Sequence, residues 1–207
     1  MHVSTIRAIV AAFGLSYEPG VRGLGASEDR LLDARHAELL GAAAAWLRRL
    51  GWQTRSEASY SEWGERGSVD LLAWHGATAS LLVIEIKTEL ASVEATLRKL
   101  DEKVRLAGVI VRPFGWTPGS ISRLLILPED RTQRRRVNAH APILLSAFPT
   151  RSRRIQAWCR APSKSIDGLI FLACPAGSPR TTDRARRERV RAAQRPATPS
   201  GLSPPQA

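Results

Sequence analysis

The sequence predicts an α/β domain in which one long helix precedes three strands and a second helix precedes a fourth strand. Three observations support this class. Apolar residues recur at helical spacing over about residues 27–50 and 92–107. Short apolar runs at residues 69–74 and 81–87 have the length and composition of strands. A similar run at residues 123–127 is expected to be the fourth strand.

The first long helix is expected to begin at Ser27 and to end at about Leu50, just before Gly51. Its first turn is mainly acidic and its last turn is basic, and both charges suit the helix dipole. The side chains expected to face the core are Leu32, Leu40, Ala43 and Leu47. Residues 52–60 are expected to be extended, and residues 61–68 to form a polar loop.

The second helix is expected to run from about Ser92 to Ala107, with one apolar face formed by Val93, Leu97, Leu100 and Val104. After the fourth strand, residues 131–147 are expected to be helical, with a bend or break at Pro142. Residues 153–160 predict a short helix, and residues 169–173 predict a last buried strand.

We expect one domain over residues 26–176, with appendages at both ends. Residues 1–25 carry an apolar stripe at helical spacing and then a segment rich in Gly, which predicts a helix and a linker. From Gly177 the apolar periodicity stops. Residues 177–207 are rich in Arg, Pro and small polar residues, so we expect a disordered basic tail.

The composition points to a polyanionic partner. Lys and Arg number 31 against 19 Asp and Glu, which gives a formal net charge of +12. Nucleic acid is the commonest partner of such a chain, and an anionic membrane surface is less common. No apolar run has the length of a membrane-spanning helix. Cys159 and Cys174 lie far apart and outside any CxxC pattern, so we expect core thiols in a reducing cytoplasm.

The hairpin formed by the second and third predicted strands carries the candidate chemistry. If residues 75–80 form its loop, Trp74 pairs with Leu81, and counting back places Asp70 opposite Glu85. Paired residues have Cβ atoms about 4.5–5.5 Å apart, and like charges at that distance are destabilising. Two carboxylates in this position therefore need a stabilising partner.

A hard divalent cation is one such partner, because magnesium takes oxygen ligands and is commonly held by one or two carboxylates. We therefore expect Asp70 and Glu85 to bind Mg²⁺ or Mn²⁺. Strand alternation places Lys87 on the same face as Glu85. There it could orient the attacking water or stabilise charge on a phosphate. The alternative is a structural ion pair at a sheet edge, in which Lys87 neutralises Glu85.

The combination of Asp70 with Glu85-Ile86-Lys87 resembles the core motif of the PD-(D/E)XK nuclease superfamily. The resemblance covers about residues 27–130, including the helices before and after the hairpin. It implies a restriction-endonuclease-like α-β-β-β-α-β core, with a mixed central sheet flanked by helices. It also implies Asp70, Glu85 and Lys87 as catalytic residues. Val69 stands where the motif has its proline.

Many members of this superfamily use a further acid from the first helix, and the sequence offers several candidates. Asp33 and His36 continue the apolar stripe of that helix, whereas Glu38 lies beside the stripe. Glu65 and Ser68 precede Asp70 closely and are further candidates for the site. Each has an ordinary structural alternative. His36 can be a hydrogen-bonded structural histidine, and Glu65 and Ser68 can belong to an ordinary loop.

Arginines beyond the fourth strand are candidate phosphate contacts. The first group is Arg131, Arg134, Arg135 and Arg136, and the second is Arg151, Arg153, Arg154 and Arg160. A solvated basic helix face is the alternative. Trp52, Trp116 and Trp158 are expected in the core rather than stacked on bases.

The segment Val3–Tyr17 is similar to the last helix and exit strand of a Cro/C1-type helix-turn-helix domain. Overall the chain resembles actinobacterial proteins that join such a domain to a nuclease-like one, here with most of the helix-turn-helix missing. Together these features predict metal-dependent hydrolysis of DNA. One alternative is a non-catalytic DNA-binding transcriptional regulator that retains the fold, and another is a protein-interaction module. The oligomeric state stays open, a homodimer included.

Overall fold

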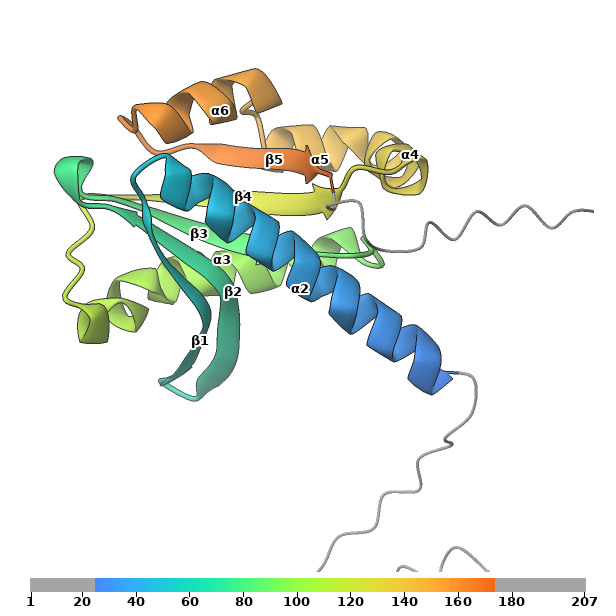
Figure 1. Ribbon diagram of the computed structural model, residues 1–207, viewed down its shortest axis with the longest axis horizontal. Helices are drawn as coiled ribbons and strands as arrows, with labels where there is room; N and C mark the ends of the chain where they lie inside the picture. The colour runs from blue at the N-terminus through green and yellow to red at the C-terminus, as the bar shows by residue number, and fades with distance from the viewer. Residues whose placement is uncertain (1–24, 174–207) are drawn as a thin grey trace, which may run out of the picture.

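The computed structural model describes the backbone of residues 25–173 and the side chains from Arg30 onward. The expected N-terminal helix and the expected basic tail lie outside these described residues. The described chain is an α/β structure with a five-stranded mixed sheet and helices on both faces (Figure 1). The helices are α2 (Gly25–Arg49), α3 (Val93–Ile110), α4 (Arg131–Ala139), α5 (Ala141–Ala147) and α6 (Ser152–Arg160). The strands are β1 (Gln53–Glu62), β2 (Glu65–His75), β3 (Ser80–Ile86), β4 (Ser120–Pro128) and β5 (Asp167–Leu172).

The strands lie in the sheet in their chain order, from β1 to β5. The strands β1, β2 and β3 form an antiparallel meander, and β4 and β5 then join parallel to β3. A parallel neighbour requires a crossover connection, and α3 supplies the one between β3 and β4. As a result, β3 and β4 end at the same edge of the sheet, which we call the C-terminal edge.

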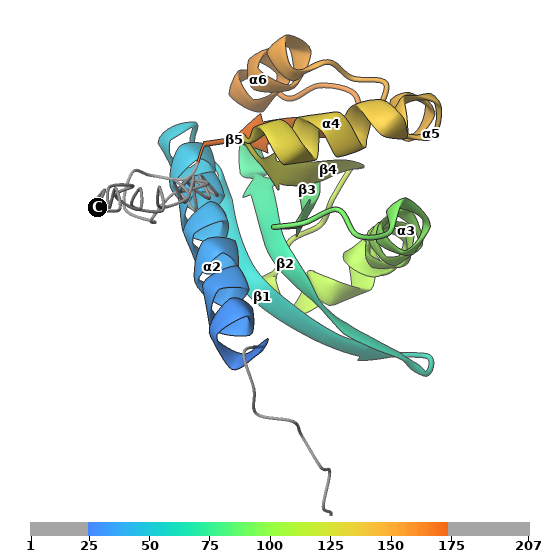
Figure 2. The ribbon, with the colours of Figure 1, turned by 90° about the vertical axis from the view of Figure 1, so that its right-hand side faces the viewer.

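Helices lie on both sides of the sheet (Figure 2), and an apolar core lies between the sheet and each layer of helices. One core joins α2 and α6 to the sheet through residues such as Leu47 and Ile155. The other lies under α3 and α5 and includes Leu100 and Leu144. Among residues 25–173, none of the helices combines the length and the apolar composition that crossing a membrane requires.

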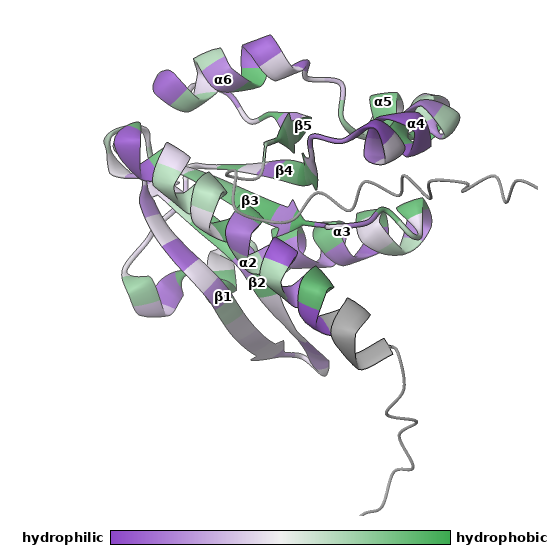
Figure 3. Cartoon of the chain, turned by 45° about the vertical axis from the view of Figure 1, so that its right-hand side comes forward, coloured by the Kyte–Doolittle hydropathy of each residue, from purple (hydrophilic) through white to green (hydrophobic). Residues whose placement is uncertain are grey.

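The central strand β3 is buried along its whole length, because strands pair with it on both sides and helices cover both its faces. Figure 3 accordingly shows hydrophobic residues along β3 and β4. The predicted alternation is confirmed: Leu82, Ile84 and Ile86 belong to the core under α2. Leu81 and Val83 belong to the core under α3. A charged residue on β3 therefore lies on a buried strand.

The expectation of a polar loop over residues 61–68 is wrong. The strands β1 and β2 continue through this segment and are joined by a turn of only two residues, Trp63 and Gly64. Their φ angles are 48° and 84°, as a tight hairpin turn of the primed type requires. The polar composition of the segment reflects two exposed strands that extend past the end of β3.

Two helix predictions also need correction. Leu32, expected on the core-facing side of the first helix, is 40% exposed, and Leu39 is fully buried where Leu40 was expected. The single bent helix expected over residues 131–147 is two helices that meet at His140. Proline lacks the backbone N–H that an interior helical position needs, and Pro142 therefore falls in the first turn of α5.

The tryptophans expected in the core are found there. Trp52, Trp116 and Trp158 are 3%, 7% and 6% exposed. Trp52 donates a hydrogen bond from its indole nitrogen to the backbone oxygen of Cys159, at 2.8 Å. Cys159 is itself fully buried, and burial raises the pKa of its thiol to about 12. Cys159 is therefore a core residue, as expected, and is protonated at neutral pH.

Candidate functional site

The predicted register of the β2–β3 hairpin is confirmed along its ladder, which ends at the pair Leu71–Ile84. The same register carried one residue further brings Asp70 beside Glu85, near the end of β3. This place is the C-terminal edge of the sheet, which faces the viewer in Figure 2. Strand pairing alone thus brings the two predicted acids together.

The Glu85 carboxylate is almost completely buried, with 2% of its side chain exposed. One of its oxygens, Oε1, lies 2.8 Å from Nζ of Lys87. The other, Oε2, contacts Nζ of Lys103, which belongs to α3. Both oxygens of this buried carboxylate therefore bind an ammonium group, which offsets the free-energy cost of removing the charge from water.

The Asp70 carboxylate also uses both of its oxygens. Oδ2 accepts a hydrogen bond from the backbone N–H of Ile86, at 2.7 Å. Oδ1 lies 3.2 Å from Nζ of Lys103. The side chain of Asp70 is 15% exposed, so this acid lies closer to the surface than Glu85 does.

The β1–β2 ladder is interrupted beside Asp70. Glu57 lies opposite Asp70, yet the two form no ladder pair, and Glu57 has a φ of 52°. Such a φ is uncommon for residues other than glycine. Val69 belongs to the core under α3 and Leu71 to the core under α2, although residues two apart normally share a face. The regular alternation of β2 is therefore interrupted between Val69 and Leu71, whereas Asp70 lies on the α3 side of the sheet, as alternation from Leu72 requires.

Lys103 is the site residue that the sequence analysis missed. Its side chain is 7% exposed, and its ammonium joins Asp70 of β2 to Glu85 of β3. The buried face of α3 comprises Val93, Thr96, Leu100, Lys103, Leu106, Ala107 and Ile110. The expected face contained Val104 instead of Lys103. The sequence did offer one signal for Lys103. It lies three residues after Leu100 and therefore on the same face of the helix, and a lysine on a buried face needs an acidic partner.

The four charges of this cluster cancel, since two carboxylates face two ammonium groups. The chain therefore holds its crowded acids together without any added ion. The ion pair expected as the alternative, between Lys87 and Glu85, is present in the structure. Lys87 is 39% exposed and is the most accessible member of the cluster. Its ammonium lies where a molecule at the C-terminal edge could reach it.

The carboxylates of Asp70 and Glu85 are chemically suited to a hard divalent cation, but they are only two ligands. Carboxylate oxygens are the ligands that Mg²⁺ prefers, and Mg²⁺ often takes only one or two of them while it keeps several waters. Asp70 and Glu85 supply these oxygens from two neighbouring strands. Within residues 30–173, no group of three or more His, Cys, Asp or Glu side chains is arranged to hold a metal. A cation bound here would thus rest on two carboxylates and water.

The other predicted site residues lie apart from this cluster. Asp33 is exposed on α2, and His36 on the same helix is partly buried. Glu65 forms an ion pair with Arg105 of α3, at 2.5 Å. The hydroxyl of Ser68 is buried and has no hydrogen-bond partner among the described residues.

The predicted arginines of α4 flank the C-terminal edge. The helix begins just after β4, with Asp130 capping its first turn through a hydrogen bond to the backbone N–H of Gln133. Arg134 pairs with Glu129, and Arg136 pairs with Glu89. The other two, Arg131 and Arg135, are exposed, and in the described part of the chain no acid pairs with them. Figure 3 shows α4 as mainly hydrophilic.

Side-chain contacts join the segment that follows β3, and also α2, to α4. The side-chain oxygen of Gln133 accepts a hydrogen bond from the backbone N–H of Leu90, at 3.1 Å. Arg35 of α2 reaches across to Asp130, at 2.7 Å. The helices α2 and α4 are thus joined at the edge where Asp70, Glu85 and Lys87 lie.

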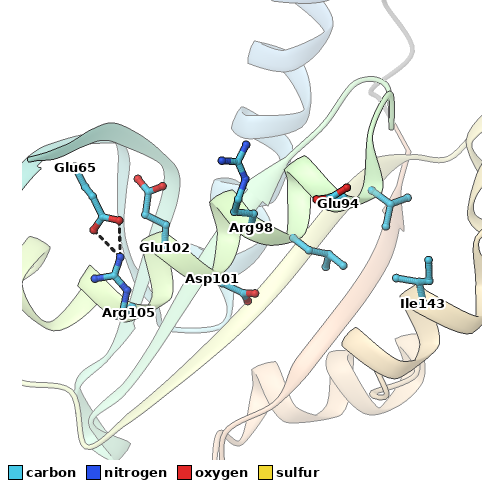
Figure 4. Close-up of a pocket in the computed structure, with 9 residues that line it drawn as sticks. Glu65, Glu94, Arg98, Asp101, Glu102, Arg105 and Ile143 are labelled. Atoms are coloured by element: carbon cyan, nitrogen blue, oxygen red, sulfur yellow. Dashed lines mark hydrogen bonds and ion pairs between the residues drawn. The ribbon is translucent and has the colours of Figure 1, made fainter.

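An open pocket lies elsewhere, on the outer side of α3 (Figure 4). It has a volume of about 790 Å³ and contains none of the four clustered residues. Its charged side chains largely neutralise each other: Figure 4 shows Glu65 against Arg105, and Glu102 accepts hydrogen bonds from Lys99. These hydrogen bonds, with one from Tyr60, lower the pKa of Glu102. We place the candidate site at the buried charge cluster, where the chemistry is, and not at this pocket.

No model of a known protein family matches the chain, and a comparison with curated proteins also finds no match. The interpretation of the site therefore rests on its own geometry.

The cluster predicts unequal effects of removing its two acids. We expect Glu85→Gln to lower the free energy of unfolding by about 3 kcal/mol, because it leaves the buried ammonium of Lys103 with a weakened partner. We expect Asp70→Asn to cost less, since the amide oxygen can still accept the hydrogen bond from Ile86. Urea denaturation of both variants in EDTA measures the two losses. Equal losses, or a larger loss for Asp70→Asn, would contradict this description of the cluster.

Proposed function

We propose that this chain is a metal-dependent nuclease-like protein that hydrolyses phosphodiester bonds of DNA. The observation that carries the proposal is the meeting of Asp70, Glu85 and Lys87 at one open edge of a buried sheet. Acids on two paired strands, with a lysine two residues beyond the second acid, are the arrangement that the predicted nuclease motif requires.

The order of the elements supports a restriction-endonuclease-like fold. From α2 to β4, the chain runs helix, three strands, helix, strand, and the three strands form a meander to which β4 adds in parallel. This is the α-β-β-β-α-β order that the motif implies. It also puts the motif at the carboxyl end of β3, beside a parallel neighbour, where open α/β sheets commonly bind their ligands.

In this proposal Asp70 and Glu85 would hold Mg²⁺ or Mn²⁺. When bound, such an ion supplies a Lewis acid for the phosphate and lowers the pKa of its water. Lys87 would orient the attacking water or stabilise negative charge on the phosphate, for which its 39% exposed side chain is accessible. Asp33, His36 and Glu65 remain candidates for further contacts to the ion, each from outside the present cluster.

The proposed substrate is DNA because of the charge of the chain and the position of α4. The net charge of +12 favours a polyanion. Arg131 and Arg135 are exposed beside the C-terminal edge and could contact phosphates there. We further propose a cytoplasmic protein, with which the buried free thiol of Cys159 agrees.

One observation favours a second function. Lys103 already satisfies both acids, as it would in a non-catalytic DNA-binding regulator that kept the fold and lost the need for metal. Such a protein would bind DNA with divalent ions or EDTA alike and would cleave nothing. Cleavage is therefore the property that separates the two functions.

We expect the purified chain to nick or cut plasmid DNA with Mg²⁺ or Mn²⁺ and to be inactive in EDTA. Lys87→Ala should reduce the cleavage rate by about 100-fold or more, the range in which proton-transfer and charge-stabilising groups act. Lys99→Ala is the matched control, because Lys99 is exposed on α3 and, among the described residues, its ion pair is with Glu102. Gel assays measure the cleavage rates, at a temperature where the parent and both variants are fully folded. Equal rates for the two variants would remove Lys87 from the mechanism, and no cleavage by the parent would favour the regulator.

We also expect the double variant Arg131→Ala/Arg135→Ala to bind duplex DNA more weakly in EDTA. The slope of log affinity against log salt should become shallower by up to about 2, because each arginine that neutralises a phosphate adds close to one unit to the slope. Arg49→Ala/Arg112→Ala removes the same charge at the opposite edge of the sheet and should leave the slope nearly unchanged. Fluorescence anisotropy over a salt series measures both. If the two double variants behave alike, binding depends on overall charge and not on α4.

A further inference from the structure

Lys103 occupies the place between the two acids. Its Nζ lies 3.2 Å from Oδ1 of Asp70 and also contacts Oε2 of Glu85. The remaining oxygen of Asp70 is bound by the backbone N–H of Ile86, and the remaining oxygen of Glu85 by Lys87. Every carboxylate oxygen of the cluster therefore has a partner within the chain.

We propose that Lys103 is a resident cation that competes with divalent metal for Asp70 and Glu85. This inference rests on the proposed metal-dependent function and adds a regulatory residue to its site. In the metal-free protein the ammonium neutralises the acid pair and keeps it folded. A divalent ion binds only when the ammonium has withdrawn from both carboxylates.

The structure gives three reasons for competition instead of a purely structural ion pair. First, a single nitrogen contacts both acids, which is the position that a shared metal ion would need. Second, the side chains of Asp70 and Lys87 are 15% and 39% exposed, so an ion from solvent can reach the cluster from the C-terminal edge. Third, lysine carries its charge on a flexible four-carbon stem with no fixed bidentate geometry, so it can leave the carboxylates without moving α3.

Competition makes a quantitative prediction for metal affinity. The metal-competent state is the one in which Lys103 has withdrawn. If that state is a minor conformer, populated at about 10% or less, the apparent metal affinity is reduced at least about tenfold. Replacing the ammonium by an uncharged group of similar length should remove this reduction.

The test compares the parent chain with Lys103→Met and Lys103→Gln by calorimetric titration with Mn²⁺ and by thermal melts. Both variants should melt below the parent in EDTA, because two crowded carboxylates then have only Lys87 as a cation. Both should bind Mn²⁺ at least about tenfold more tightly than the parent. They should also gain more thermal stability from it. Glutamine can still donate N–H groups to the carboxylates, so Lys103→Gln provides a folded variant if Lys103→Met does not fold in EDTA.

Lys99→Met is the matched control, with the same loss of charge on the exposed side of α3, and it should bind Mn²⁺ like the parent. Unchanged or weaker Mn²⁺ binding in both Lys103 variants would overturn the inference, as would absence of binding in every protein. The two proposals fail differently. If the Lys103 variants bind Mn²⁺ more tightly but the parent does not cleave DNA, the competition proposal stands and the nuclease proposal fails. If the parent cleaves DNA but the Lys103 variants bind Mn²⁺ no more tightly, the nuclease proposal stands and the competition proposal fails.

Discussion

The ammonium of Lys103, held between the carboxylates of Asp70 and Glu85, is the interaction on which the rest of the site depends. Glu85 lies on a strand that is buried on both faces, so its charge must be matched from within the protein. The helix α3 provides that match from one side of the sheet, and Lys87 provides it from the strand itself. The interaction also connects fold to function, because α3 is the crossover that makes β4 parallel to β3 and creates the edge at which the cluster opens.

The pairing of the acids could be predicted because it depends on local rules. Strand alternation and the loop length determine the β2–β3 register, and the register places Asp70 beside Glu85. The continuation of β1 and β2 through residues 61–68 was missed because the exposed strands there have a polar, loop-like composition. The turn at Trp63 also puts an aromatic residue at a positive φ, where turn sequences usually have Asn or Asp.

Lys103 was missed for a different reason. Its contact with Glu85 joins residues 18 apart in the chain through the packing of α3 on the sheet. The helical pattern of α3 is compatible with more than one buried face, and a lysine at position 103 looks solvated until the acids beneath it are known. The interruption of the β1–β2 ladder was also not predicted: Glu57 has a φ of 52° and forms no ladder pair with Asp70. Such long-range charge pairing and backbone irregularity leave little trace in one sequence.

The same geometry gives the chain two ways to balance its acids. An internal cation makes the fold independent of metal, whereas a divalent ion would provide the chemistry that the exposed Lys87 could assist. The basic helix α4 and the joined ends of α2 and α4 border the site and could guide a phosphate backbone to it. A protein that uses both arrangements would be stable without metal and active only with it.

The most direct measurement is a crystal structure of the parent chain soaked in Mn²⁺, with anomalous scattering recorded to locate the metal. Our interpretation predicts an anomalous peak bound to Asp70 and Glu85, with Nζ of Lys103 no longer touching either carboxylate. If Mn²⁺ is absent from these two acids and Lys103 still joins them, the cluster is a structural ion network, and the nuclease proposal is contradicted.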